Sequence, residues 1–109
     1  MDTTQNMLIQ LMLTACEKID IKQWDTIKPH AEHEFKGLLI MLEWINKMNR
    51  QNEMSTEQAR IHIDIQKNTM RTRLMTLPNI SMMDAEHIIN TAIDSIRKKL
   101  YEQMDWVII

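Results

Sequence analysis

The chain has 109 residues, of which 44% are apolar and 26% are charged, with a net charge of −2 and a single glycine. This length corresponds to one domain spanning residues 1–109. One glycine is too few for the tight turns of a β-sandwich or barrel, and it excludes the glycine-rich phosphate-binding loops. One cysteine excludes an internal disulfide and any zinc site built from several cysteines.

Charge argues against a nucleic-acid partner, and the lack of a signal-peptide or membrane-span pattern predicts a cytoplasmic protein without a membrane partner. A net charge of −2 lacks the basic excess that is typical of nucleic-acid-binding domains. A basic cluster in residues 60–77 is typical of a solvated helix face. The chain has no signal-peptide pattern and no run of eighteen apolar residues, so no membrane span is expected. Cys16 is therefore expected to remain a thiol.

The first predicted helix covers about residues 3–20. Its apolar residues recur at spacings of three and four, which predicts one buried face. They are Leu8, Leu11, Met12, Ala15, Cys16 and Ile19. Because Cys16 belongs to this stripe, we expect it to be a small core residue rather than a catalytic nucleophile.

The second predicted helix runs from about Pro29 to Gln51, with Asp25 or Thr26 as a candidate cap. A 3-and-4 seam predicts its buried face, made of Ala31, Phe35, Leu38, Leu42 and Ile45. Ile40 and Trp44 lie almost opposite Phe35 and Leu42, on the same side as His33 and Gly37. A helix that is apolar on two sides is either central in the fold or meets a partner.

The third predicted helix begins after Ser55, because Gln58 three residues later completes a capping box. Residues 61–66 alternate with the period of a strand, but they lie in a long stretch without Gly or Pro, so we predict helix. Ser81 and Asp84 cap a fourth helix after the Pro78 connector. The buried stripes of these two helices are predicted to be Ala59, Ile63, Met70, Leu74 and Leu77, and Ala85, Ile88, Ile89, Ala92, Ile96 and Leu100.

Four amphipathic segments with short connections predict an all-α, antiparallel four-helix bundle. The second apolar side of the second helix and an apolar C-terminal tail, about residues 105–109, exceed what one such bundle can bury. A homo-oligomer is the simplest way to cover this surplus. The expected contact residues are Ile40, Trp44, Trp106, Val107 and Ile108.

A polar cluster near the start of the second helix offers a possible metal site. His30 faces both His33 and Glu34 across one helical turn, a spacing that can supply two or three transition-metal ligands. The alternative is an exposed, charged first turn of the helix. No Glu-x-x-His pair occurs, which argues against a di-iron bundle, and no cofactor is expected.

The string His33-Glu34-Phe35-Lys36-Gly37 resembles the core of histidine-phosphotransfer domains, which read His-x-Leu-Lys-Gly and are four-helix bundles. The resemblance covers these five residues. It implies that His33 accepts a phosphoryl group, that Lys36 helps to neutralise that group, and that Gly37 leaves room for a receiver domain. The alternative is that Gly37 permits close helix packing and that His33 is simply exposed.

The sequence therefore predicts a small non-enzymatic helical protein that acts through protein–protein contact and self-association. Two alternatives stay open, a histidine-phosphotransfer-like module centred on His33 and a metal-binding bundle using His30, His33 and Glu34.

Overall fold

The computed structural model describes residues 3–104 and residue 109, and this part of the chain forms a four-helix bundle without strands, as predicted. The helices are α1 (Thr3–Glu17), α2 (Trp24–Arg50), α3 (Thr56–Leu74) and α4 (Met82–Met104). Connections of five to seven residues join them, so consecutive helices run antiparallel. No cis peptide bond occurs in the described chain.

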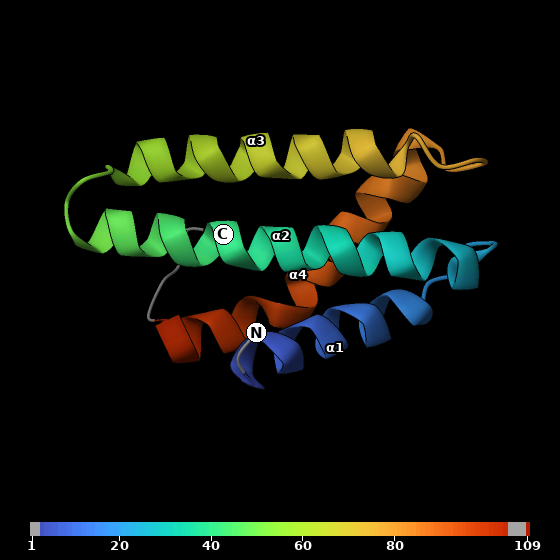
Figure 1. The fold of residues 1–109 in the computed structure, drawn as a ribbon, viewed down its shortest axis with the longest axis horizontal. Helices are drawn as coiled ribbons and strands as arrows, with labels where there is room; N and C mark the ends of the chain where they lie inside the picture. The colour runs from blue at the N-terminus through green and yellow to red at the C-terminus, as the bar shows by residue number, and fades with distance from the viewer. Residues whose placement is uncertain (1–2, 105–108) are drawn as a thin grey trace.

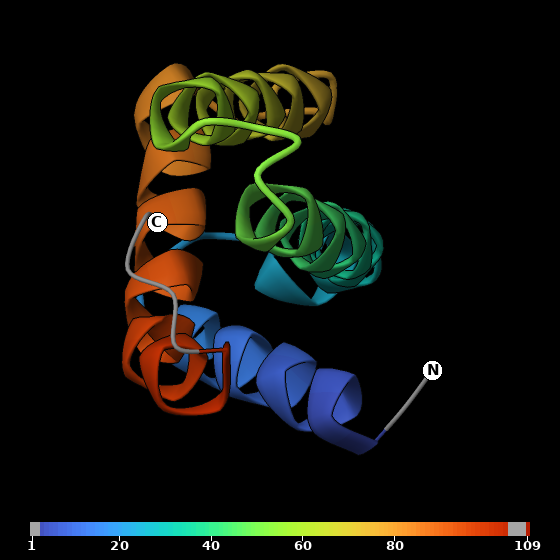
Figure 2. The same cartoon turned by 90° about the vertical axis from the view of Figure 1, so that its left-hand side faces the viewer.

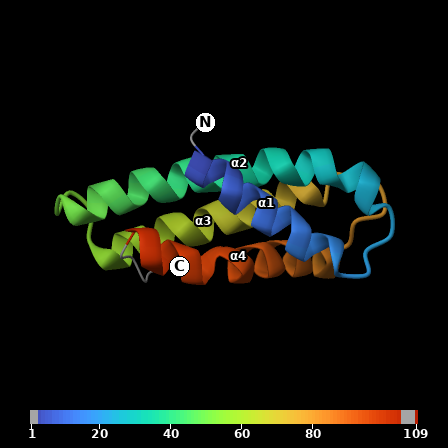
Figure 3. The same ribbon diagram turned by 90° about the horizontal axis from the view of Figure 1, so that it is seen from below.

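Helices α3, α2 and α1 lie side by side, and α4 crosses behind them from α3 to α1 (Figure 1). The end view shows that α4 occupies one side of the bundle while the opposite side of α2 and α3 has no helix over it (Figure 2). Figure 3, seen from below, shows α1 crossing α2 at an angle. Each helix contacts its neighbour in the chain, and α1 contacts α4, which closes the ring.

Both predicted N-terminal caps are confirmed. The Ser55 hydroxyl accepts a hydrogen bond from the Gln58 backbone N–H at 3.1 Å, and the Gln58 side chain accepts one from the Ser55 N–H at 2.9 Å. Ser81 and Asp84 make the same reciprocal pair at the start of α4. These bonds satisfy backbone donors that a helix leaves free at its first turn. Residues 61–66 are helical, as predicted despite their alternation.

The predicted start of α2 is wrong. The helix begins at Trp24, and its N-cap is Gln23, which has a positive φ of 65° and no side-chain capping bond. Neither Asp25 nor Thr26 caps the helix. The sequence pattern placed Pro29 in the first turn, yet burial of Ile27 against the core extends the helix backward past it. Pro29 is exposed, so water can satisfy the carbonyl that its missing N–H leaves unpaired.

The core is one continuous apolar cluster contributed by all four helices. Its largest fully buried side chains include Met12, Phe35, Leu42, Ile88 and Ile96. Each such side chain stabilises the fold by roughly 1.5–3 kcal/mol relative to an exposed position. Helix α1 is buried more widely than predicted. Ile9 and Leu13 join the core because α1 packs against both α2 and α4.

The end of the chain is described only at Ile109. This residue is half-buried and packs against the core of its own chain, and its carbonyl oxygen accepts a hydrogen bond from Arg97 Nε at 3.1 Å. The predicted contact residues Trp106, Val107 and Ile108 lie outside the described residues. Among the described residues, no helix combines the length and the apolar character needed to cross a membrane.

Replacing the cap residue of α3 tests how this helix is initiated. Ser55→Ala removes the acceptor for the Gln58 N–H, so we expect the free energy of unfolding to fall by about 1 kcal/mol. Ser55→Asp retains an acceptor at this position, so its free energy of unfolding should lie within a few tenths of a kcal/mol of the wild-type value. Urea denaturation followed by circular dichroism measures both. Equal stabilities for Ser55→Ala and Ser55→Asp would show that the cap bond is unimportant.

Candidate functional site

The candidate site is an exposed apolar area on the outer side of α2 and α3, opposite the core. It comprises Ile40 and Trp44 on α2 and Ile61 and Ile65 on α3, with exposed fractions of 54%, 44%, 53% and 50%. We call these four residues the outer α2–α3 face. His62 links the two helices, because its ring packs edge-on against Trp44 with 6.0 Å between centroids. Scattered exposed apolar residues are ordinary, whereas a group of them on adjacent helices makes this face the candidate site.

The helical period explains why these isoleucines are exposed. Ile61, Ile63 and Ile65 alternate in sequence, and each step of two residues turns a helix by about 200°. Ile63 therefore points into the core at 2% exposure while Ile61 and Ile65 point to solvent. Ile61 and Ile65 were not among the contact residues expected from the sequence. The alternation itself was the signal, since period-2 apolar residues on a helix cannot all be buried.

A groove of about 510 Å³ lies between α2 and α3 beside this face. Its apolar wall is formed by Leu38, Ile40, Met41 and Met70. His33 and the charged groups lie toward the N-terminal half of α2, and these groups are Glu34, Lys36 and Arg73, while Gln66 lines the groove from α3. Gly37 also lines the groove. The groove thus combines an apolar wall with charged groups at one end.

One ion pair ties the two helices together at the polar end of the groove. Glu34 is buried, and its carboxylate accepts a hydrogen bond from Arg73 Nη1 at 3.3 Å. The arginine side chain is 63% exposed, so solvent screens this pair. The expectation of an exposed, charged first turn is therefore wrong for Glu34. Because α2 begins at Trp24, this residue lies in the third turn and faces α3.

The metal-binding alternative finds no support among the described residues. Within them, no group of three or more His, Cys, Asp or Glu side chains is arranged to hold a metal ion. His30, His33 and Glu34 thus do not form a three-ligand cluster. His30 and His33 are exposed, whereas Glu34 is directed to Arg73. The other two histidines lie on other helices, His62 against Trp44 on α3 and His87 on α4.

His33, Lys36 and Gly37 all border the groove. His33 is exposed, and the Lys36 ammonium lies 3.5 Å from the Glu32 carboxylate one turn earlier. A Cβ built on Gly37 meets no atom within 4 Å. Gly37 therefore does not serve close packing between helices within one copy of the chain. Its missing side chain instead leaves open space on the outer surface of α2.

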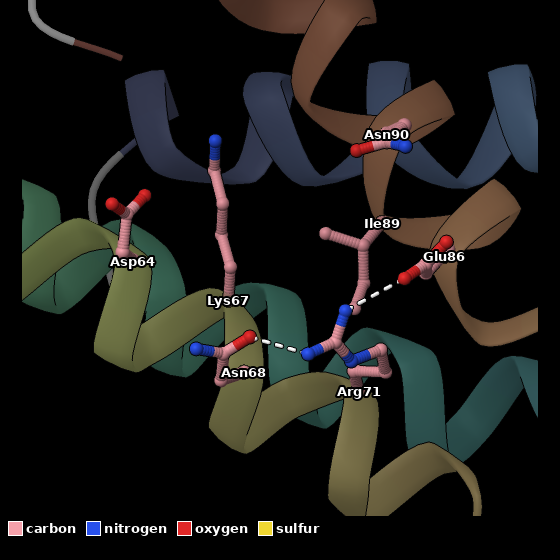
Figure 4. A pocket seen from close by; sticks show the side chains of 7 residues that line it. All are labelled: Asp64, Lys67, Asn68, Arg71, Glu86, Ile89 and Asn90. Carbon is pink, nitrogen blue, oxygen red and sulfur yellow. Dashed lines mark hydrogen bonds and ion pairs between the residues drawn. The ribbon is translucent and has the colours of Figure 1, made fainter. Parts of the chain in front are cut away.

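A second depression lies between α3 and α4 and is polar (Figure 4). Its volume is about 370 Å³, and its lining carries Asp64, Lys67, Asn68 and Arg71 from α3 and Glu86, Ile89 and Asn90 from α4. Arg71 is held by Glu86 at 2.7 Å and by Asn68. The acidic and basic groups balance, so this part of the predicted basic cluster offers no excess positive charge to a phosphate backbone.

Cys16 is a core residue, as predicted. It is fully buried, and its thiol donates a weak hydrogen bond to the Ile88 carbonyl at 3.5 Å. Burial raises the pKa of the Cys16 thiol to about 12, because the charged thiolate loses its hydration. A nucleophilic cysteine needs the opposite shift and access to substrate. The geometry therefore excludes Cys16 as the centre of a catalytic site.

No protein-family model, no curated protein and no solved structure matches the chain. The candidate site is thus defined by its geometry alone.

The burial of Cys16 predicts very slow chemical modification. With a pKa of about 12, the thiolate fraction at pH 8 is about one in ten thousand, and the sulfur is also shielded from reagents. We expect Cys16 in the native protein to resist a chromogenic disulfide reagent for hours. In about 6 M guanidinium chloride, which unfolds the chain, the same thiol should react completely within minutes. Rapid stoichiometric labelling of the native protein would contradict this placement of the thiol.

Proposed function

We propose that this chain is a non-enzymatic helical interaction module that acts in the cytoplasm and associates with itself through the outer α2–α3 face. The observation that carries the proposal is the group of four exposed apolar residues on two adjacent helices, centred on the Trp44–His62 contact. Tryptophan is among the residues that contribute most to protein interfaces. The free thiol at Cys16 is compatible with a reducing compartment.

The physical driving force is burial of apolar surface. Each of the four side chains already has about half of its surface covered, so complete burial recovers roughly half of the 1.5–3 kcal/mol that such a side chain can contribute. In a symmetric dimer both copies bury these side chains, so this gain in free energy counts twice. The total gain must exceed the several kcal/mol lost in translational and rotational entropy on association. We therefore expect concentration-dependent assembly.

Trp44→Asp tests the outer α2–α3 face directly. A carboxylate at this position would be buried without a partner, so we expect self-association to weaken at least tenfold. Light scattering over a range of protein concentrations measures the mass. Met83→Asp is the matched control, because Met83 is 80% exposed at the start of α4, away from this face. A wild-type protein that stays monomeric, or a Trp44→Asp variant that assembles normally, would refute the proposal.

A second candidate function is phosphotransfer at His33. The specific observation that favours it is the exposed imidazole of His33 on the same side of α2 as Gly37, where an added Cβ would meet no atom within 4 Å. A neutral imidazole is a competent nucleophile near pH 7, and an open surface would let a phosphodonor domain approach. Arg73 and Lys36 border the same groove and could neutralise a phosphoryl group.

Phosphorylation of the purified protein by a receiver domain tests this candidate. We expect His33→Gln to abolish the acid-labile phosphorylation, because glutamine has no ring nitrogen to attack phosphorus. His30→Gln is the control, since His30 is equally exposed one turn earlier on α2 and should leave the phosphorylation unchanged. Equal labelling of both variants, or no labelling of the wild type by any of a panel of receiver domains, would eliminate this candidate.

A further inference from the structure

We propose that two copies of the chain pair through the outer α2–α3 face about a two-fold axis, with α2 antiparallel to α2 of the other copy and Trp44 of each copy filling the space over Gly37 of the other. This inference rests on the proposed self-association and adds to it a defined register. It assigns a role to Gly37, which sits exposed in the middle of the longest helix.

The register of the two α2 helices follows from the spacing between Gly37 and Trp44. Gly37 and Trp44 are seven residues apart, which is two helical turns, so they lie on the same side of α2. The midpoint between them falls between Ile40 and Met41. A two-fold axis at this level, with antiparallel helices, places each Trp44 opposite Gly37 of the other copy. Ile40 then lies at the centre of the interface, where apolar contacts are best shielded from water.

The surface beside Gly37 has space for the indole ring of Trp44 of the other copy. No atom lies within 4 Å of a Cβ built on Gly37, and the adjoining groove of about 510 Å³ has Leu38, Met41 and Met70 in its wall. A tryptophan side chain buries roughly 150–250 Å² at an interface. A glycine within a helix costs about 1 kcal/mol relative to alanine. Neither a close helix contact nor a positive φ explains this glycine within one copy.

The same two-fold axis also brings an exposed apolar residue of α3 opposite a hollow on α3 of the other copy. The contacts Glu34–Arg73 and Trp44–His62 fix how α3 is aligned with α2, and they place Gln66 near the level of the axis. Ile61 of one copy then comes level with residues 69–72 of the other. At this point α3 carries a hollow of about 410 Å³ lined by Ile65, Asn68, Thr69, Thr72 and Arg73. A second exposed apolar residue thus meets a second depression in the same arrangement.

Charge and area are consistent with a second copy as the occupant. Lys47 comes level with residue 34 of the other copy, between Glu32 and Lys36, which form an ion pair, so this register opposes no unbalanced like charges at that point. The 19 residues of α3 and the matching length of α2 offer a face of roughly 30 by 20 Å. Two copies would bury on the order of 1,200 Å² in total, the lower end of the range for specific interfaces.

Gly37→Leu is the decisive variant. A Cβ added at this position meets no atom within 4 Å, the position is exposed, and leucine favours helix more than glycine does, so the monomer should fold normally. It would occupy the space proposed for Trp44 of the other copy. We expect the dimer dissociation constant, from sedimentation equilibrium, to rise at least tenfold, with an intermediate rise for Gly37→Ala. Circular dichroism and the melting temperature, measured at low concentration, verify the fold.

A cross-linking experiment provides an independent test. Ile40→Cys places a reactive thiol at the proposed axis, while the native thiol at Cys16 is buried. A short bis-maleimide should convert this variant to a covalent dimer efficiently, and a Met83→Cys variant should not be converted. Dimer formation that is insensitive to Gly37→Leu, with equal cross-linking at both positions, would overturn the register but leave self-association intact. A monomeric wild type would refute both.

Discussion

The burial of one side of α2 is the constraint on which the rest of the structure depends. Phe35, Leu38, Leu42 and Ile45 occupy the centre of the core, with α1 on one flank of the helix and α3 on the other. Helix α2 is also apolar on its far side. When the four core residues point inward, Ile40 and Trp44 on that far side are necessarily left exposed to solvent. The exposed face is thus a direct geometric consequence of the packing of the core.

The alignment of α3 against α2 determines what accompanies that face. The Glu34–Arg73 pair at one end and the Trp44–His62 contact at the other hold the helices in a single register. The pair adds little stability, since Arg73 is well hydrated. Its effect is positional, because it keeps a charged group at one end of the groove and leaves the apolar wall beside Gly37.

The features that depend on local sequence patterns were predictable. The four helices, the caps at Ser55 and Ser81, and the exposure of Ile40 and Trp44 all follow from periodicity and side-chain chemistry. The start of α2 was not predictable, because burial of Ile27 against the other helices outweighs the usual position of proline. The contribution of Ile61 and Ile65 to the face, the Glu34–Arg73 pair and the open space over Gly37 required knowledge of how α3 lies against α2.

The contact between α1 and α4 has a consequence for how the chain reaches its native state. These two helices are furthest apart in the sequence, yet they pack together and close the ring. During synthesis, α1, α2 and α3 emerge before the helix that covers Leu13 and Cys16 is available. The nascent chain therefore carries uncovered apolar surface until the last quarter of the sequence is translated, and contacts so distant in sequence are slow to form. The stage most exposed to aggregation or to chaperone capture is the period just before α4 docks.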